Sequence, residues 1–527
     1  MEVRRRQPER REPVRHAEIH DVVDGAVPRS SFYSSPFGRM FGRLEPWVPA
    51  GATDDEREAT LLEFTQQHMV ESDDSLLSEN KAIAAGYTYF GQFVDHDITF
   101  DPTSSVLRQN DPNKLRNFRT PRFDLDSVYG AGPEASPYLY DTTDHGKFLI
   151  GVGESGVEDD LPRNHQGIAL IGDPRNDENL IVSQLQLAFL KLHNRVLDGV
   201  RVRHPGLDTG QSFRRAQQIV RWFYQYVVWN DFIRLLVHDT LHNDALGTLV
   251  DDVSTSKHTT ARAARRRFYR WKQAPYIPVE FSVAAYRFGH SMVRPGYQVN
   301  STIGFGEEFE LPIFSDPNDR SSDLRGGRPL PAGFQMQWDW FFPMPSSGQP
   351  FPQNSRRIDT KLSPAMSHIP KGGGTVPLAF LNLRRGWRMD LPSGPAVADA
   401  LGIPAAGRPV IEAGTPEESL WFYILKETTT LGSMSGKMLG PVGGTIIAEV
   451  FAGLLDGDPL SFVNLDPLWT PAKEPVLVDL LRTASPNQDD WNVGDLLVAA
   501  GVDVPTNAAS DPIVFPGTRG RRRTPVQ

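Results

Sequence analysis

The chain has 527 residues, of which 39% are hydrophobic and 23% charged, and its formal net charge is −10. This composition is close to the average of globular proteins, and the acidic balance argues against a nucleic-acid binder, which usually carries a basic face. Because the chain contains no cysteine, disulfides, Cys-ligated zinc or iron–sulfur sites and a haem thiolate ligand are excluded.

The two ends of the chain are polar and rich in arginine. No long apolar segment follows the first arginines, and no stretch is long and apolar enough to span a bilayer, so we expect neither a secretory signal nor a membrane anchor. We predict a flexible arginine-rich arm over 1–30, one domain over 31–505 and a tail over 506–527. The protein would then be cytoplasmic, or secreted by a route that needs no signal peptide.

Residues 87–100, YTYFGQFVDHDITF, place four polar side chains in an otherwise apolar run. On a helix, Gln92 and His96 share one face because they are four residues apart, and Asp95 lies close to that face. Asp97 points roughly 100° away from His96, toward another site. A lone histidine is more often a hydrogen-bonded structural residue, and zinc or non-haem iron is a competing use of the Asp-His-Asp triplet.

Residues 120–130, TPRFDLDSVYG, carry oxygen-bearing side chains at even spacing. Thr120, Asp124 and Asp126, with the carbonyl of Arg122 between them, offer the oxygen ligands that calcium prefers. The spacing differs from that of an EF-hand, so the local chemistry leaves a calcium loop and an ordinary aspartate-rich turn as equal alternatives.

A long helix is predicted over 180–200, where apolar residues recur every three or four positions, and the same spacing continues over 213–241. Just before the first of these, Arg175 and Glu178 are three residues apart, on one face of a first helical turn. The helix dipole favours an acidic residue there but not a basic one, which indicates another purpose for Arg175.

His290 stands after a glycine in residues 286–297, YRFGHSMVRPGY. Histidine is a frequent metal ligand, and its second ring nitrogen then needs a hydrogen-bond partner. Taken alone, this histidine would more often be structural. The stretches 308–357 and 365–378 are rich in proline, glycine and serine, and we interpret them as long surface connections.

Further helices are predicted near the C-terminal end. Two lie within 419–455, broken at Gly440–Pro441 and Gly443–Gly444, and short ones lie over 476–481 and 495–500. Strand-like alternation is rare, so a core of this size must be built from helix packed on helix. The predicted fold class is mainly α: a single large helical domain with long irregular loops and little β structure.

Together, these motifs resemble the peroxidase–cyclooxygenase superfamily, the animal-type haem peroxidases that include myeloperoxidase and lactoperoxidase. The motifs are GQFVDHD, TPRFDLDSVYG, IGDPRNDEN with HNRV, YRFGH, LNLRRG and LGPVGGTIIAEVFAGLLDGDP. Each is weak alone, and their order over residues 35–465 carries the resemblance. The absence of cysteine and the tight loops resemble a bacterial branch. The resemblance implies that 31–505 is a helical haem peroxidase domain around a buried b-type haem.

The resemblance assigns roles on the two sides of the haem. His96 matches the distal histidine, Gln92 its neighbour and Arg175 the distal arginine. His290 matches the ligand of the haem iron, and Asn382 matches the asparagine that accepts its ring N–H. His96 would take a proton from peroxide and return it to the leaving oxygen, while Arg175 would stabilise the charge that develops as the O–O bond breaks.

Further residues match positions around the cofactor and a calcium ion. Asp95 and Glu178 match the carboxylates that form ester bonds to haem in animal members, and Arg287 lines the cofactor. The implied calcium ligands are Asp97, Thr120, Arg122 through its carbonyl, Asp124 and Asp126. The partners would be hydrogen peroxide and a small reducing donor such as a phenol, a halide or thiocyanate, with no nucleic acid and no membrane span.

The chain departs from the family pattern at two places. Asn179 stands where myeloperoxidase has a methionine bonded to the haem, so no sulfonium link is expected. After LNLRRG the chain reads Trp387-Arg388-Met389-Asp390, where animal members usually have Arg-Asp-His-Gly. This difference concerns the packing around Asn382 and not the iron ligand.

Two other functions stay open. A fatty-acid dioxygenase of the same superfamily has a radical-forming tyrosine three residues before the proximal histidine. Arg287 occupies that position here, and Tyr286 is one place away, which would aim it elsewhere on a helix. A non-catalytic, calcium-dependent interaction protein is the second alternative, although the polar residues assigned to both sides of the haem are all present.

Overall fold

The structure is a computed structural model. It describes residues 27–28, 33–34, 37–71, 78–100, 117, 119–247, 249–252, 259–262, 264–271, 274–301, 303, 310–314, 323–344, 352–371, 374–430, 434–481 and 491–502. The predicted tail over 506–527 lies outside these residues, as does the predicted arm over 1–30 except for Val27–Pro28.

Helices make up most of the regular structure. In the described part of the chain they are α1 Asp54–His68, α2 Gly86–Ile98, α3 Asp126–Tyr129, α4 Leu180–Arg203, α5 Thr209–Val227, α6 Arg234–Leu236, α7 Asp239–Leu246, α8 Val279–Val283, α9 Leu378–Arg388, α10 Gly394–Leu401, α11 Leu420–Thr430, α12 Pro441–Gly457, α13 Phe462–Leu465, α14 Pro475–Leu481 and α15 Val493–Ala500. None of these helices is both long and apolar enough to cross a membrane.

The strands are short and pair two by two. They are β1 Val27–Pro28 with β2 Tyr33–Ser34, β3 Glu79–Ala84 with β8 Asn354–Arg356, β4 Leu249–Asp252 with β5 Thr259–Arg262, β6 Gly296–Tyr297 with β7 Leu311–Pro312, and β9 Ile369–Lys371 with β10 Gly374–Val376. All five pairs are antiparallel. The mainly α fold class with little β structure is therefore confirmed.

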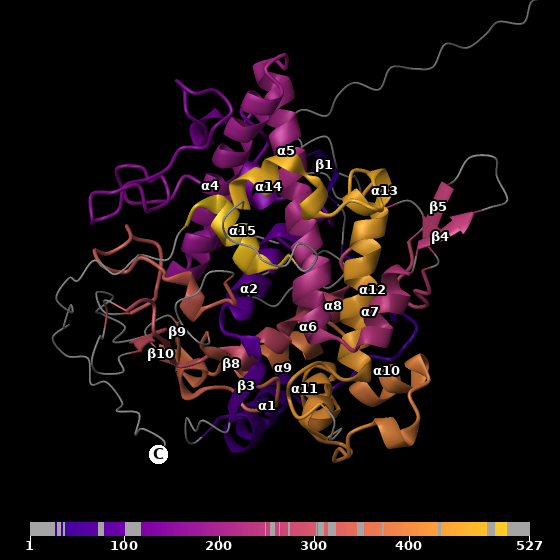
Figure 1. The fold of residues 1–527 in the computed structure, drawn as a ribbon. Helices are drawn as coiled ribbons and strands as arrows, with labels where there is room; N and C mark the ends of the chain where they lie inside the picture. Colours follow the sequence, from indigo (N-terminus) through magenta and orange to yellow (C-terminus); the bar gives the residue numbers. More distant parts are fainter. Residues whose placement is uncertain are drawn as a thin grey trace, which may run out of the picture.

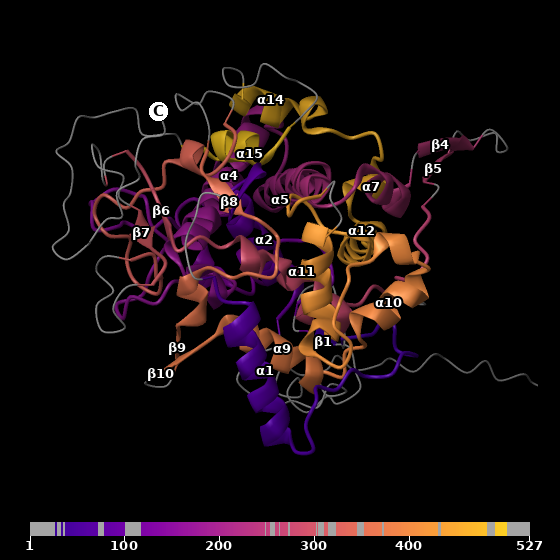
Figure 2. The same cartoon turned by 90° about the horizontal axis from the view of Figure 1, so that it is seen from below.

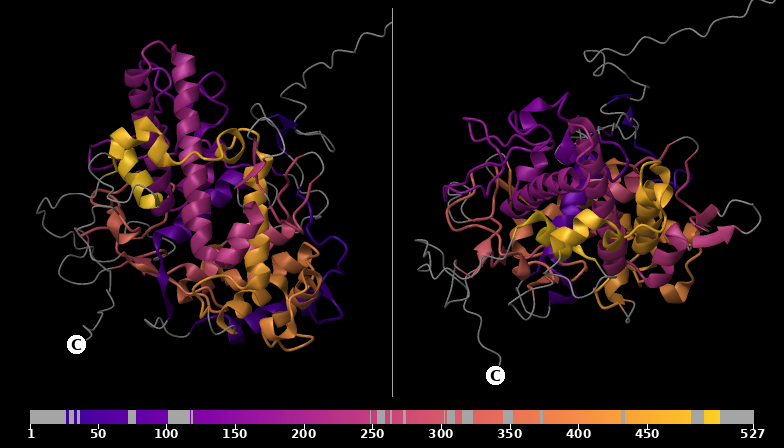
Figure 3. Two further views of the ribbon diagram at one scale, coloured as in Figure 1. Left: turned by 45° about the vertical axis from the view of Figure 1, so that its right-hand side comes forward. Right: turned by 45° about the horizontal axis from the view of Figure 1, so that its top comes forward.

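The core is formed by helices packed on one another. The helices α4 and α5 lie side by side, with α14 and α15 against α4, and α12 packs beside α7 (Figure 1). Seen from below, α2 lies inside this arrangement and α1 extends from one side (Figure 2). The hairpin of β4 and β5 projects away from the helices (Figure 3). The central position of α2 places its polar residues among several elements.

Helix α4 confirms the helix predicted over 180–200 and extends it by three residues, to Arg203. Asn179 caps its first turn, because the Asn179 side chain accepts a hydrogen bond from the backbone N–H of Val182 at 2.9 Å. Basic residues in its last turn suit the negative end of the helix dipole. The short predicted helices near the C-terminus are confirmed as α14 and α15.

The helical pattern predicted over 213–241 does not form one uninterrupted α-helix. Helix α5 ends at Val227 and is followed by a π-helical turn, Val228–Ile233, before α6 and α7. The turn is tied to α2, because the Tyr87 hydroxyl donates to the Asp231 carboxylate at 2.7 Å. Single π turns inside helical segments often occur near functional sites, and this one fixes the helix that carries His96.

The predicted breaks within 419–455 are partly wrong. Helix α11 ends at Thr430, and α12 begins at Pro441, where a proline is well suited to the first helical position. Gly443 and Gly444 then lie inside α12 and do not break it. A Cβ on Gly443 would stand 2.7 Å from the Ile424 side chain, so glycine here permits close packing of α12 on α11.

The described part of 308–357 is largely irregular, as predicted, but it is not at the surface. The prediction for 365–378 is wrong, because this stretch contains most of the 3₁₀ helix Pro364–Ser367 and the hairpin of β9 and β10. Phe334, Trp338, Phe341 and Phe342 are all buried. The backbone nearby also pairs through β8 with β3. The proline and glycine content of 308–357 indicated irregular backbone correctly, but large aromatic side chains bring this backbone into the core because burying them is favourable.

Candidate active site

Helix α2 packs tightly enough to place its polar residues deep in the protein. A Cβ on Gly86 would stand 2.5 Å from the Phe342 ring, and a Cβ on Gly91 would stand 2.9 Å from the Phe232 ring. Glycine at both positions therefore allows neighbouring aromatic rings to approach the helix backbone. His96, near the end of this helix, is buried.

The His96 ring is held by an asparagine from a distant part of the sequence. Asn176 lies in the 3₁₀ helix Pro174–Asp177, and its Oδ1 is 2.8 Å from Nδ1 of His96. The Nδ2 of Asn176 donates to Gln186 at 2.8 Å, which directs Oδ1 toward the histidine. His96 then carries its proton on Nδ1, and Nε2 keeps a free lone pair. Burial, helped by Arg175, lowers the pKa of His96 to about 3.

A carboxylate and two amides lie beside the free nitrogen of His96. Glu178 Oε1 is 3.7 Å from Nε2 of His96, and Gln92 donates to the same carboxylate. Asn179 donates to Gln92 Oε1 at 3.1 Å. Gln92, Glu178 and His96 are thus brought together as predicted, and Asn179 links the cap of α4 to them.

The Glu178 side chain is partly exposed, yet the surrounding protein still affects its pKa. Its side chain is 48% exposed, yet burial raises its pKa to about 7. An accessible side chain that is surrounded by protein lines an internal space. Beside His290, a Cβ on Gly289 would meet no atom within 4 Å.

Arg175 lies against the end of α2. Its Nη2 donates to the His96 carbonyl at 3.0 Å and to Asp173 at 2.9 Å. The guanidinium carbon lies 4.8 Å from the centre of the Phe100 ring. Nη1 makes no hydrogen bond to a described residue, so this nitrogen is the part of the side chain available to a ligand.

His290 lies on a second short element, the 3₁₀ helix Ala285–Met292. Its Nδ1 is 2.8 Å from Nδ2 of Asn382 on α9, and Arg287 donates to Oδ1 of the same asparagine at 3.0 Å. Asn382 thus lies against His290, but its Nδ2, and not the oxygen that was predicted to accept the ring N–H, faces Nδ1. Burial, followed by the charge of Arg287, lowers the pKa of His290 to about 3.

The orientation of the Asn382 amide decides which nitrogen of His290 is available. While Arg287 donates to Oδ1, the amide presents Nδ2 to His290, and the proton of the neutral ring then lies on Nε2. A metal ligand needs Nε2 free and Nδ1 protonated. Iron binding therefore requires a half-turn of the Asn382 amide, so that Oδ1 accepts from Nδ1–H.

The two histidine-bearing elements are in direct contact. The Tyr286 hydroxyl donates to the Gly91 carbonyl of α2 at 3.0 Å. Burial raises the pKa of Asp95, against the opposing charges of Arg175 and Arg287. Asp95 therefore lies within electrostatic reach of an arginine from each side of the site.

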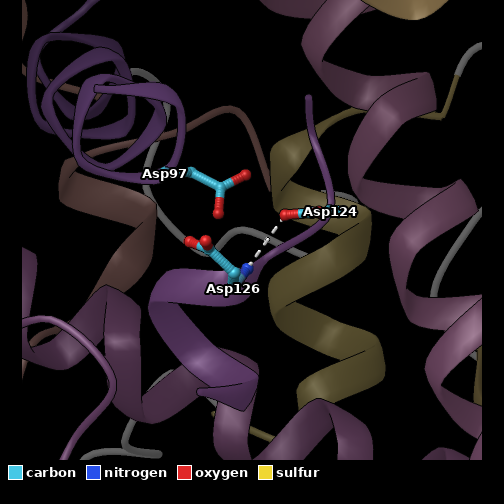
Figure 4. A group of neighbouring side chains, drawn as sticks. All are labelled: Asp97, Asp124 and Asp126. Carbon is cyan, nitrogen blue, oxygen red and sulfur yellow. Dashed lines mark hydrogen bonds between the residues drawn. The ribbon is translucent and has the colours of Figure 1, made fainter. Parts of the chain in front are cut away.

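A cluster of three buried carboxylates lies on the other face of α2. Asp97, Asp124 and Asp126 offer oxygens that all lie within 4.8 Å of one another, and their side chains point toward one another (Figure 4). Thr120 donates to Asp124 at 2.7 Å. Burial and the two neighbouring carboxylates raise the pKa of Asp97 well above its ordinary value. A divalent cation would relieve this repulsion, and four of the five predicted calcium ligands are assembled.

The fifth predicted calcium ligand, the carbonyl of Arg122, stays a prediction. The guanidinium of the same residue approaches Asp458 at 3.8 Å.

Three residues of the site were not predicted from the sequence: Asn176, Asp173 and Arg119. Asn176 directly follows Arg175, so its motif was noticed, but its contact with His96 spans 80 positions and depends on the packing of α2 against the start of α4.

Comparison with protein families gives one match in this chain. A model described as animal haem peroxidase matches residues 105–320. Heme peroxidase 2 of Caenorhabditis elegans is 26% identical over 318 residues, which cover 56% of this chain and 40% of that protein. Alpha-dioxygenase PIOX of Oryza sativa is 35% identical over 122 residues, covering 23% of this chain and 19% of that protein. The chain thus spans less than half the length of these relatives.

Solved structures share the fold over most of the chain. Peroxidase A from Dictyostelium discoideum has a TM-score of 0.59 and 14% identity, covering 90% of this chain and 95% of its own. The fatty acid alpha-dioxygenase of Oryza sativa has a TM-score of 0.54 and 17% identity, covering 89% and 79%. At these identities the likeness concerns the arrangement of the helices.

Proposed function

We propose that this chain, whose residues 105–320 match the animal haem peroxidase family, is a haem peroxidase that reduces hydrogen peroxide and oxidises a small donor. The observation that carries the proposal is the pair of histidines on contacting elements, His96 buried and His290 half-buried, each with Nδ1 against an asparagine amide. Burial keeps both rings neutral. One neutral histidine suits proton transfer and the other suits metal binding.

His290 would hold a b-type haem, and the support beside it is that a Cβ on the neighbouring Gly289 would meet no atom within 4 Å. The bound haem would supply the redox chemistry, namely the electrons that reduce peroxide and are recovered from the donor. Asn382 would orient the ring by accepting from Nδ1–H, which increases the basicity of the ligating nitrogen. Arg287 and Asp95 would lie along the cofactor edge.

His96 would act as the base and then the acid for peroxide. Its Nε2 accepts the proton of the incoming hydroperoxide and later returns it to the leaving oxygen. Asn176 fixes the tautomer that makes this possible. Arg175 would donate through Nη1 to the oxygen on which negative charge develops, and Gln92 would help to place the peroxide beside His96.

A calcium ion would bind at Asp97, Thr120, Asp124 and Asp126, with the carbonyl of Arg122 as a further ligand. The support is the donor set: buried carboxylate and hydroxyl oxygens at the spacing of a hard cation. Because Asp97 directly follows His96, the ion would hold the end of α2. Metal analysis of the purified protein tests the assignment.

Ester bonds from Asp95 and Glu178 to the haem are part of the proposal. Burial raises the pKa of both carboxyls, and hydrogen peroxide would supply the oxidation that joins a carboxyl oxygen to a haem methyl group. After exposure to peroxide, haem should stay with the protein in acidified organic solvent. Complete extraction of haem from peroxide-treated protein would contradict the ester bonds and leave the peroxidase proposal intact.

The deciding experiment is an absorption spectrum of protein produced with ample haem precursor and calcium, before and after hydrogen peroxide. We expect an intense haem band that shifts with peroxide and returns on adding a phenolic donor. The His290→Ala variant should lose the band. Wild-type protein that folds and shows no haem band would overturn the proposal in favour of a non-catalytic protein.

The donor is to be identified by competition among a phenol, a halide and thiocyanate. The fatty-acid dioxygenase alternative is disfavoured by Arg287, which donates to Asn382 at 3.0 Å in the position of the radical-forming tyrosine. Tyr286 does not replace it, because its hydroxyl donates to the Gly91 carbonyl. Oxygen uptake with a long-chain fatty acid would reverse this preference.

A further inference from the structure

Arg119 is a buried arginine that bridges two parts of the site. Only 2% of its side chain is exposed. Its Nη1 donates to Asp126 at 2.8 Å, its Nε donates to Asp173 at 3.2 Å, and its Nη2 also pairs with Asp173. Asp126 belongs to the proposed calcium site, whereas Asp173 lies at the start of the segment that carries Arg175.

Asp173 is shared between two arginines. Besides Arg119, it accepts hydrogen bonds from Nε of Arg175 at 3.1 Å and from Nη2 at 2.9 Å. The two guanidinium groups also lie against one ring, at 5.5 Å and 4.8 Å from the centre of Phe100. A continuous chain of charges therefore runs from Asp126 through Arg119 and Asp173 to Arg175.

We propose that Arg119 is a positioning residue, an internal cation that couples the proposed calcium site to the placement of Arg175. The inference rests on the proposed function, since it assumes a calcium ion at Asp126 and a peroxide-binding role for Arg175. One guanidinium compensates a carboxylate on each side. The positive charge of Arg119 weakens calcium binding at Asp126. Its planar guanidinium group also holds Asp173, the carboxylate that orients Arg175.

The two effects of Arg119 have opposite signs. A positive charge next to Asp126 repels a calcium ion bound by the same carboxylate, so removing the charge strengthens calcium binding. Asp173 loses a donor at the same time, so Arg175 is held less firmly and peroxide reacts more slowly. A residue with a merely structural role would weaken both properties together when replaced.

The test is the Arg119→Met variant of the haem-bound protein. Calcium affinity is measured by competition with a chromophoric chelator, and the peroxide reaction by stopped-flow absorption of the haem band. We expect calcium to bind about tenfold more tightly, in keeping with one unit charge removed at short range. We expect the rate constant with peroxide to fall about tenfold or more, as when a fixed catalytic geometry is loosened.

Arg294→Met is the matched control. Arg294 is also buried and pairs with two carboxylates, Glu79 at 3.1 Å and Glu310 at 2.8 Å, but neither belongs to the calcium site. Its replacement should lower stability and leave calcium affinity unchanged. The control separates the loss of any buried ion pair from the loss of this particular charge.

Arg119→Lys tests the inference even if Arg119→Met does not fold. Lysine keeps the positive charge but not the planar fork that serves two carboxylates. Calcium affinity should then stay near the wild-type value while the peroxide reaction slows. A calcium affinity that is unchanged or weaker in Arg119→Met, or wild-type peroxide kinetics in both variants, would overturn the inference.

The failure of this inference can be told from that of the proposed function. A wild-type protein without a haem band refutes the peroxidase itself. A haem-bound wild type that reacts with peroxide, but whose Arg119 variants fail as described, refutes only the coupling.

Discussion

At the scale of single residues, the two histidines of the site owe their roles to their surroundings. His96 is buried and His290 is half-buried, and the protein around each ring lowers its pKa to about 3. Their difference lies in the partners: Asn176 accepts from His96, while Asn382 is shared by His290 and Arg287. In the proposed function, the same side chain would serve as a base on one side and as a ligand on the other.

Replacing His96 by alanine should slow the reaction with peroxide by about 10²- to 10⁴-fold, the usual contribution of a general acid–base group. Haem content should be retained, because the proposed iron ligand is His290. Stopped-flow absorption measures the rate. The matched control is His193→Gln: His193 is also buried, but it pairs with Tyr129 and the Gly146 carbonyl, so its loss should leave the rate near that of the wild type.

Glu178 should give the peroxide reaction a pH dependence near neutrality. Its pKa is raised to about 7 by burial, so the carboxyl is neutral below this pH and negative above it. A negative charge 3.7 Å from Nε2 of His96 stabilises a proton on that nitrogen. The rate constant should therefore increase as the pH rises through 7, whereas His96, with a pKa of about 3, titrates far below.

Glu178→Gln should remove this step and leave a flat profile. The measurement is the pH profile of the first reaction with peroxide, taken before any ester bond to the haem has formed. A step near pH 7 that persists in the glutamine variant would assign the titration to another group.

At the scale of elements, glycines decide how closely helices approach the aromatic core. Gly86 and Gly91 do so on α2, and Gly443 and Gly453 do so on α12. A sequence pattern registers glycine as a possible helix break. In α2 and α12 the same residue type instead marks a close contact, because a neighbouring side chain occupies the space of the missing Cβ.

Gly453→Ala should destabilise the protein by about 1–3 kcal/mol, the usual effect of overpacking. The added Cβ would stand 2.4 Å from the Tyr269 ring, and both groups are fixed by the packing of α12. Urea unfolding measures the change. Gly206→Ala is the control, since its Cβ would meet nothing within 4 Å, and its free energy of unfolding should change by less than about 0.5 kcal/mol.

At the scale of the whole molecule, the proposed calcium site joins segments that are far apart in the chain. Asp97 comes from α2, Asp124 from the segment that leads into α3, and Asp126 is the first residue of α3. This segment is held from α5, where Gln225 donates to the Phe123 carbonyl at 3.0 Å. The Phe123 ring stacks on Phe451 of α12 at 5.2 Å. The cluster is therefore tied to the main helices.

Removing calcium should lower the thermal stability of the whole protein. A ligand at a hundredfold excess over its Kd stabilises the folded state by about 2.7 kcal/mol, and its removal leaves three buried carboxylates clustered together, with Arg119 paired to Asp126. Differential scanning calorimetry with and without chelator measures the shift in Tm. Asp124→Asn should abolish the response, whereas the exposed Asp399→Asn should keep it. An identical Tm with and without chelator would contradict the calcium assignment.

Much of the site was predictable because its residues lie in short motifs. Helical spacing alone placed Gln92 and His96 on one face and Asp97 on another, and the structure bears this out. The resemblance assigned the pairing of His290 with Asn382. Helix α4 followed from its apolar spacing and its asparagine cap, since both are local properties of the chain.

The remainder depended on contacts between distant segments. No pattern in the nearby sequence predicts the contact of Asn176 with His96 or the sharing of Asp173 by Arg119 and Arg175. The same is true of the burial of the aromatic residues near Trp338. The π-helical turn after α5 is likewise linked to the distant α2, through the hydrogen bond from Tyr87 to Asp231.

The sequence by itself therefore determined the helical class, most of the helices and the side chains that carry the chemistry, because spacing and residue type act over a few positions. Only the tertiary structure decided the protonation states and the links between the sites. Those depend on burial and on charges brought together from distant positions, and electrostatic energy is set by distance in space and not along the chain.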